Sequence, residues 1–264
     1  MFLVVVLLTL VFFALYALGV RQVFNDRNFG EFEDIDPTVL AGSTLFGLSM
    51  FATLFLGAVL AVFLTLGVVR GDAERGLLQP LVVRPLGRRT FLLARFGAAA
   101  GVCVLYVWAV FTGCLVITHW LGNGWWPDRF VVPALGLAAA VVAVVALSLL
   151  GSVYLSGTAN GIAVFMLFGA GLVAGLLGQI GEALDSHTLE RAATITSWAL
   201  PFEALYQDAL NAISSESFGL SRVALQLGPF GGAEAGGSSL WLYSLAYLGV
   251  VAVLAAVGFD RRDL

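Results

Sequence analysis

Six long runs of apolar residues are the feature that most constrains the fold of this 264-residue chain, and none of them contains Asp, Glu, Arg or His. Because the hydrocarbon core of a bilayer is about 30 Å thick, an α-helix needs about 20 apolar residues to cross it. Each run therefore predicts one transmembrane helix. The runs are Phe2–Val20, Leu45–Gly67, Gly97–Thr118, Val131–Leu150, Thr158–Ile180 and Leu240–Gly258.

The composition also indicates a membrane protein. Hydrophobic residues make up 60% of the chain and charged residues only 11%, whereas about a quarter of a soluble domain is charged. The runs are continuous and lack the alternation of a transmembrane β-barrel. The first run is longer than the apolar core of a signal peptide, and no basic residue precedes it, which favours a retained span. We expect an all-α membrane protein with a single transmembrane domain over residues 1–264.

The positions of the arginines predict the orientation. All 13 basic residues are Arg, and Lys is absent. Residues 68–96, 151–157 and the tail from Phe259 hold eight Arg and four acidic residues, a net charge of +4. The other connections hold five Arg and 13 acidic residues, a net charge of −8. Because Arg accumulates in cytoplasmic loops, we predict that both termini lie in the cytoplasm.

Several chemistries are disfavoured by what the chain lacks. Without Lys it has neither a Walker-type phosphate loop nor a lysine Schiff base. The spacing of His119, His187, Cys103 and Cys114 does not suit a metal site, and no nucleophile–base motif is present. Basic residues are too few for nucleic-acid binding. We expect no enzymatic activity, no metal or cofactor in this chain and no nucleic-acid partner.

The spans carry no ionisable residues, although proton- and ion-coupled transporters generally place such residues inside the membrane. An external source of energy is therefore favoured if the chain transports a solute. A passive structural membrane protein fits the same observation.

The connection over residues 70–96 holds six Arg, two acidic residues and two Pro. Its leucine-rich first part predicts a surface helix that Pro80 kinks or ends, and the residues from Arg84 to Gly87 predict a turn. A second helix is expected from Arg88 through Arg95 into the third span. A basic loop that binds anionic lipid headgroups explains the charge as well.

This connection resembles the cytoplasmic signature of type-2 ABC (ATP-binding cassette) exporter permeases. The resemblance rests on ERGLLQ, which starts at Glu74, and on LVVRPLGRR, which starts at Leu81. Leu77 stands where the family usually has Thr, and Pro80 interrupts its leucine run. The closing FDRRDL is similar to the tails of many members. Members usually begin with a basic amphipathic helix, whereas this sequence opens on an apolar run.

The resemblance implies the permease subunit of an ATP-driven exporter that works by alternating access, as a multi-pass protein of the prokaryotic inner (plasma) membrane. In this family the connection forms a coupling helix that docks in a separate ABC ATPase, which binds the ATP and Mg. A pair of ATPase subunits and a second permease copy, identical or different, are implied as partners, together with membrane lipid. The family handles substrates as different as lipids, polysaccharides and antibiotics, so none is selected here.

Six positions carry over to the docking segment. The docking end comes first and the turn that holds it second: Glu74, Arg75 and Leu78, then Arg84, Pro85 and Arg88. The short connection Ser152–Gly157 is a candidate for a second, smaller contact. The alternative function is a non-transporting membrane scaffold or assembly factor that binds lipid or protein through the same basic loop.

Three pairs of glycines have the spacing that lets membrane helices approach closely. Because Gly is frequent in membrane helices, packing within the chain and packing against a second copy both remain open. The pairs are Gly97 and Gly101, Gly157 and Gly161, and Gly171 and Gly175.

The connection over residues 181–239 is predicted to contain an outer interfacial helix that starts near Pro201. Its apolar side is Trp198, Phe202, Leu205, Tyr206, Ala209 and Ile213, and its polar side is Glu203, Gln207, Asp208 and Asn211. A connector that lies on the membrane and a substrate gate are both open interpretations. Residues 228–239 read as a flexible lead into the last span.

Overall fold

The computed structural model describes residues 2–25, 37–66, 87–127, 129–214 and 236–260. In these ranges the chain is helical, and no strand occurs. The helices are α1 (Phe2–Asn25), α2 (Pro37–Thr65), α5 (Arg88–Leu121), α6 (Val131–Tyr154), α7 (Gly157–Ala183), α8 (His187–Ala199), α9 (Pro201–Ser214) and α11 (Gly237–Asp260).

Six of these helices, α1, α2, α5, α6, α7 and α11, are long and apolar enough to cross a membrane. Five of them contain a predicted run completely, and α2 contains the second run as far as Thr65, two residues before its predicted end. The prediction of six candidate spans is confirmed. Most of the helices extend beyond the runs; α2, for example, begins at Pro37 rather than Leu45. The predicted helix from Arg88 into the third span is also confirmed as the first part of α5.

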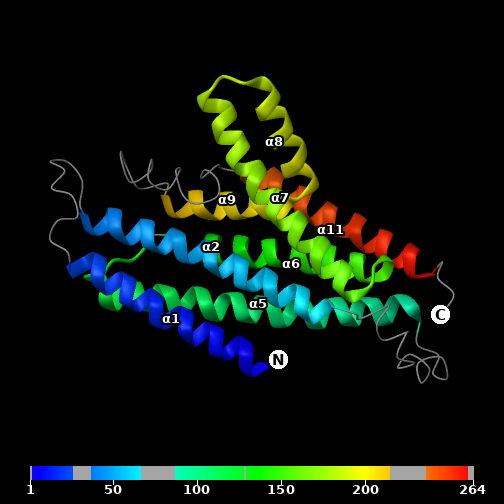
Figure 1. The fold of residues 1–264 in the computed structure, drawn as a ribbon, viewed down its shortest axis with the longest axis horizontal. Coiled ribbons are helices and arrows are strands. Elements are labelled where there is room, and N and C mark those ends of the chain that lie inside the picture. Colours follow the sequence, from blue (N-terminus) through cyan, green and yellow to red (C-terminus); the bar gives the residue numbers. More distant parts are fainter. Residues whose placement is uncertain (1, 26–36, 67–86, 128, 215–235, 261–264) are drawn as a thin grey trace.

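The helices α1, α2, α5, α6 and α11 run along the long axis of the molecule (Figure 1). The start of α1, the end of α2, the start of α5 and the end of α11 all point to the same side of the bundle. We call the region that holds Thr65, Arg89, Tyr154 and Asp260 the Arg89 end. An even number of spans returns the chain to the side where it started, whichever compartment that side faces.

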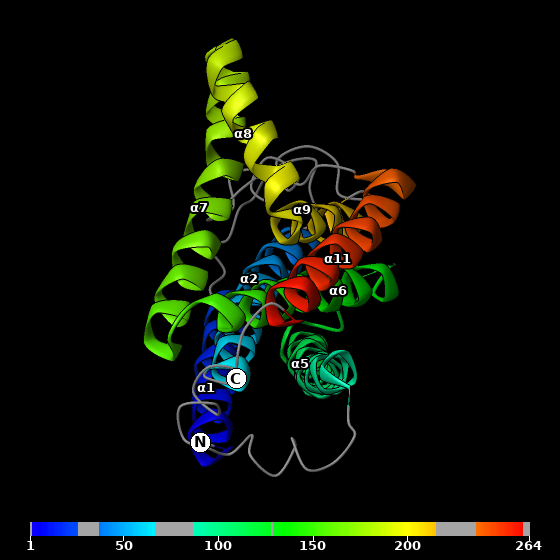
Figure 2. The same cartoon turned by 90° about the vertical axis from the view of Figure 1, so that its right-hand side faces the viewer.

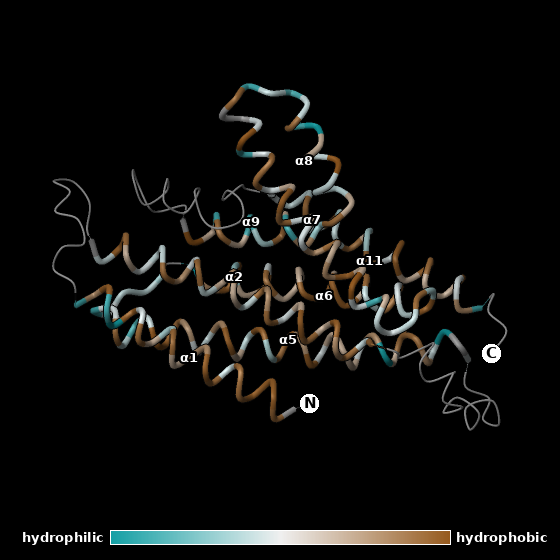
Figure 3. The backbone as a smooth tube through the Cα atoms, in the orientation of Figure 1, coloured by the Kyte–Doolittle hydropathy of each residue, from teal (hydrophilic) through white to brown (hydrophobic). Residues whose placement is uncertain are grey.

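The core lies where α2, α5, α6 and α9 meet. Its largest fully buried side chains include Phe46, Met50, Leu54, Leu137 and Phe202. The exposed residues of α1 and α5 are largely apolar and include Leu3, Leu10, Leu93 and Leu105. The tube of α1 is correspondingly brown along most of its length in Figure 3. Since lipid is as apolar as these side chains, close packing rather than removal from water must hold the helices together.

The region after α7 differs from the surface helix that the sequence predicts. The helix α8 folds back along α7 and none of its residues is buried, whereas α9 runs beside α6 inside the bundle (Figures 1 and 2). The start of α9 at Pro201 agrees with the prediction, but its position does not. Trp198 belongs to α8 instead and is 58% exposed.

The apolar side of α9 is buried and its polar side is covered in part, with Asp208 and Asn211 only partly buried. Glu203 and Gln207, placed on the polar side by the sequence pattern, are only 2% and 8% exposed. The Gln207 amide donates a hydrogen bond to the Glu203 carboxylate, which satisfies part of their buried polarity. They fit because the facing position on α7 is Gly175, where a Cβ would overlap the Glu203 carboxylate. The periodicity therefore predicted the helix, but not that α7 covers its polar side.

Candidate functional site

The predicted docking segment falls largely outside the described residues. Of its six residues, Glu74, Arg75, Leu78, Arg84 and Pro85 lie outside the described ranges, and Arg88 is described as the first residue of α5. The structure does show the two places where this segment joins the bundle, which are Leu66 after α2 and Gly87 before α5. The candidate site is therefore built from the residues around these two places at the Arg89 end.

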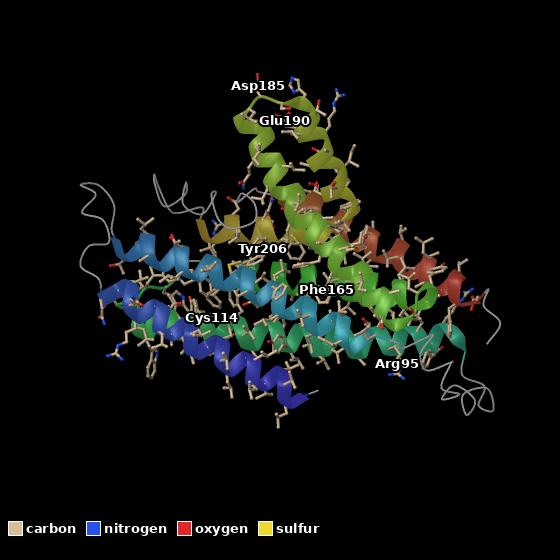
Figure 4. The ribbon with its side chains drawn as sticks, viewed as in Figure 1. Arg95, Cys114, Phe165, Asp185, Glu190 and Tyr206 are labelled. Atoms are coloured by element: carbon tan, nitrogen blue, oxygen red, sulfur yellow. The ribbon has the colours of Figure 1, made fainter. Side chains whose placement is uncertain are left out.

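The first turns of α5 are held to the last turn of α11. The Nε and Nη2 atoms of Arg89 donate to Asp260 Oδ2 at 3.2 and 3.1 Å. Their side chains are 73% and 36% exposed, and an exposed ion pair contributes at most about 1 kcal/mol. On the same turns the Arg95 guanidinium lies 5.3 Å from the centre of the Phe91 ring; Figure 4 shows Arg95 near this end of α5.

A small apolar cluster gives this contact more strength than the ion pair. The ring of Phe259 is 3% exposed and its centre lies 6.2 Å from that of Phe91. Leu92 from α5 and Val153 from α6 complete the contact between the three helices. Removing a buried aromatic ring typically costs about 3–5 kcal/mol, so packing rather than charge joins α5, α6 and α11 here.

A buried polar junction, formed by Thr65, Ser148 and Asn160, joins α2, α6 and α7. The Thr65 hydroxyl donates to the backbone oxygen of Ala61, and the hydroxyl oxygens of Thr65 and Ser148 lie 2.5 Å apart in a hydrogen bond. The Asn160 amide donates to the Ser148 carbonyl at 2.9 Å. All three residues are at most 1% exposed.

Gly151 makes room for this polar junction, because a Cβ at that position would overlap Asn160 Oδ1. That oxygen has no hydrogen-bond partner in the described part of the chain. The last turn of α2 is thus linked, through α6, to the first turns of α7.

The Arg89 end therefore connects every span except α1 through specific contacts. One end of the predicted docking segment continues from α2, which is hydrogen-bonded to α6. The other end continues into α5, which is packed against α6 and α11. A displacement of the segment would reach α2 and α5 directly, and α6, α7 and α11 through these contacts. Packed helices transmit such displacements because interiors are dense and resist compression.

The predicted glycine pairs occupy different environments. A Cβ at Gly97 or Gly101 would meet no atom within 4 Å, so this pair faces away from the described residues. A Cβ at Gly161 would lie 3.4 Å from Leu66, and Gly157 begins α7 beside the α6–α7 turn. Gly171 and Gly175 face α9, and a Cβ on Gly171 would lie 2.5 Å from the Phe202 ring.

Other glycines permit close contacts without the predicted spacing. A Cβ on Gly57 would lie 2.8 Å from Val141 Cγ2 and 3.0 Å from Val107 Cγ2. A Cβ on Gly258 would overlap the hydroxyl of Tyr154. A helix crossing needs one small residue at the point of contact, and a motif of two equally spaced glycines does not find such single positions.

Replacing Gly57 with Leu is expected to destabilise the protein by about 3 kcal/mol, because the new side chain overpacks the contact of α2 with α5 and α6. Thermal unfolding of the purified protein in a mild detergent measures the effect. Gly97→Leu is the matched control: it places the same side chain in open space, and we expect stability to be unchanged or slightly higher, since Gly weakens a helix by about 1 kcal/mol. Equal losses in both variants would contradict the packing at Gly57.

At the opposite end of the bundle, the His119 side chain packs in the turn that follows α5. Its Nδ1 lies 3.3 Å from the Trp125 carbonyl oxygen, and its ring meets Trp126 edge-on at 5.4 Å. Cys103 and Cys114 are buried thiols that form no disulfide. Within the described ranges, no three His, Cys, Asp or Glu side chains gather as metal ligands would.

A polar cavity of about 480 Å³ lies between α7, α8 and α9. Its lining includes Gly178, Glu190, Thr194, Glu203 and Gln207. The carboxylate oxygen Oε2 of Glu190 also lies 3.4 Å from His187 Nδ1. Figure 4 shows Glu190 on α8, near Asp185 at the tip of the α7–α8 hairpin. The exposed helix α8 therefore forms one wall of a polar space beside the buried helix α9.

Six long apolar helices, five of which are joined by contacts at the Arg89 end, define a multi-pass membrane protein. All 264 residues match the family described as ABC-2 family transporter protein, and the chain belongs to this family. The membership confirms the resemblance found in the sequence. Among curated proteins, no match to this chain is found.

Proposed function

We propose that this chain is the permease subunit of an ATP-driven exporter and that a separate ABC ATPase docks on residues 70–96. The observation that carries the proposal is the position of this segment. It joins the last turn of α2 to the first turn of α5. The polar junction links this turn of α2 to α6 and α7, and the apolar cluster around Phe259 links the start of α5 to α6 and α11. Membership of the ABC-2 family supports the same function.

The proposed docking contact follows from the chemistry of the segment. Glu74, Arg75 and Leu78 meet the ATPase, while Arg84, Pro85 and Arg88 keep the turn rigid. ATP and Mg bind to the ATPase, so this chain supplies neither a nucleotide site nor a catalytic residue. Closure of two ATPase subunits moves two such segments, one from each of two permease copies, in the inner membrane of a prokaryotic cell.

In the proposed mechanism, movement of the segment changes the access of a pathway between the two permease copies. The α7–α8 hairpin is suited to a gating role because its exposed helix α8 borders the polar cavity beside α9. A tilt of α8 would change the opening of this cavity, because α8 forms one of its walls and none of its residues is buried.

Affinity purification of the full chain from native membranes in a mild detergent tests the proposal. An ABC ATPase is expected to co-purify, and its ATP hydrolysis in reconstituted vesicles should respond to candidate lipids or drugs. Repeated recovery of the chain without any ATPase would overturn the transport proposal and favour a membrane scaffold that uses the same basic loop.

A further inference from the structure

An apolar groove of about 350 Å³ lies between α5, α6 and α11. Its walls are aliphatic and aromatic, with Leu92, Phe96, Leu149 and Val251 among them. Arg89 is the one polar side chain in the described lining, and it belongs to the first turn of α5. The groove therefore has a charged residue at the Arg89 end and hydrocarbon along the rest of its length.

The length of the groove suits one lipid tail. On α11 its lining residues extend from Leu248 to Val257, which corresponds to about 14 Å of helix axis at 1.5 Å per residue. One leaflet of a bilayer has a hydrocarbon depth of about 15 Å, half the thickness of the core. A groove that starts at the Arg89 end thus covers the depth of one leaflet.

The positive charge of Arg89 favours a lipid with an anionic headgroup. Its Nε and Nη2 atoms donate to a single oxygen of Asp260, and a guanidinium has five N–H groups. Three N–H groups are therefore not used by Asp260, and the side chain is 73% exposed. A phosphate oxygen pairs well with such a fork. Anionic lipids are concentrated in the cytoplasmic leaflet, which the Arg89 end faces in the orientation that the arginine distribution predicts.

We propose that the groove binds one anionic phospholipid, whose acyl chain lies between α5, α6 and α11 and whose phosphate accepts hydrogen bonds from Arg89. The phosphate accepts from the N–H groups that Asp260 does not use. Its negative charge repels the Asp260 carboxylate, so an occupied groove weakens the ion pair between α5 and α11. This proposal does not rest on ATPase docking, and its test needs no partner subunit.

Native mass spectrometry of the full chain in a mild detergent tests the site, with phosphatidylglycerol and phosphatidylcholine of identical acyl chains as probes. Phosphatidylglycerol is expected to bind about tenfold more tightly, a difference of about 1.4 kcal/mol. Arg89→Gln should reduce its binding to the level of phosphatidylcholine. Asp260→Asn is the matched control: it breaks the same ion pair but keeps the cation, so binding should be retained or increased.

Two further measurements separate the tail from the headgroup. Ala252→Phe places a ring in the groove from an exposed position and should weaken the binding of both lipids. Glycerol phosphate without acyl chains should not bind. The proposal is overturned if the two lipids bind equally to the unaltered chain, if Asp260→Asn loses as much binding as Arg89→Gln, or if Ala252→Phe changes nothing.

Discussion

Replacing Arg75 with Glu is expected to abolish co-purification of the proposed ATPase subunit with the permease. The substitution reverses the charge at the docking end of residues 70–96, and a like charge placed at a complementary interface costs several kcal/mol. Insertion into the membrane should be unaffected, because Arg75 lies between two spans and in neither. The measurement is the amount of ATPase recovered per permease in a mild detergent, with membrane fractionation as the test of insertion.

Arg191→Glu provides a control for this charge reversal. Arg191 is exposed on α8, the helix that folds back along α7 and is separate from the Arg89 end in the sequence and in Figure 1. The same change in net charge there should leave ATPase recovery unaltered. If Arg75→Glu recovers as much ATPase as the unaltered chain, the assignment of Glu74, Arg75 and Leu78 to the docking end is wrong, whereas the fold would stand.

Replacing Asn160 with Asp is expected to destabilise the protein by several kcal/mol. The side chain of Asn160 is fully buried, and its Oδ1 already lacks a partner in the described part of the chain. A carboxylate at this place carries a buried charge that costs several kcal/mol if it stays ionised. The melting temperature in detergent should fall strongly, because the polar junction between α2, α6 and α7 is lost.

A matched control separates the burial of this position from the change of an amide to a carboxylate. Asn123→Asp makes the same chemical change at an exposed turn with a positive φ of 55°. Equal deficits at both positions would contradict the burial of Asn160.

The spans were predictable because each one depends on a single stretch of sequence. Each of the six apolar runs corresponds to one long helix, although α2 ends two residues before its run does. The start of α5 at Arg88 and the start of α9 at Pro201 also agree with the sequence-based predictions. The position of α9 was not. Its periodicity is that of a helix with one apolar side, and nothing in residues 201–214 shows that the glycines of α7 cover the other side.

The contacts at the Arg89 end were also beyond prediction. Arg89 and Asp260 pair across 171 positions of the chain, and Thr65 meets Ser148 across 83. Hydroxyls and amides occur in most membrane helices, so no local pattern marks the few that meet. The predicted docking residues, by contrast, came from a resemblance within one loop and required no knowledge of packing.

The amino-acid sequence by itself determined how many helices are apolar enough to cross the membrane and which connections hold the positive charge. These properties follow from the transfer of each segment into lipid, which depends on its own composition. Only the tertiary structure decided that α9 enters the bundle, that Asn160 joins α7 to α6, and that Arg89 heads an apolar groove. In an apolar solvent, the packing of helices against one another depends on their shape and on a few hydrogen bonds. Both involve residues that are far apart in the sequence and meet only in the folded chain.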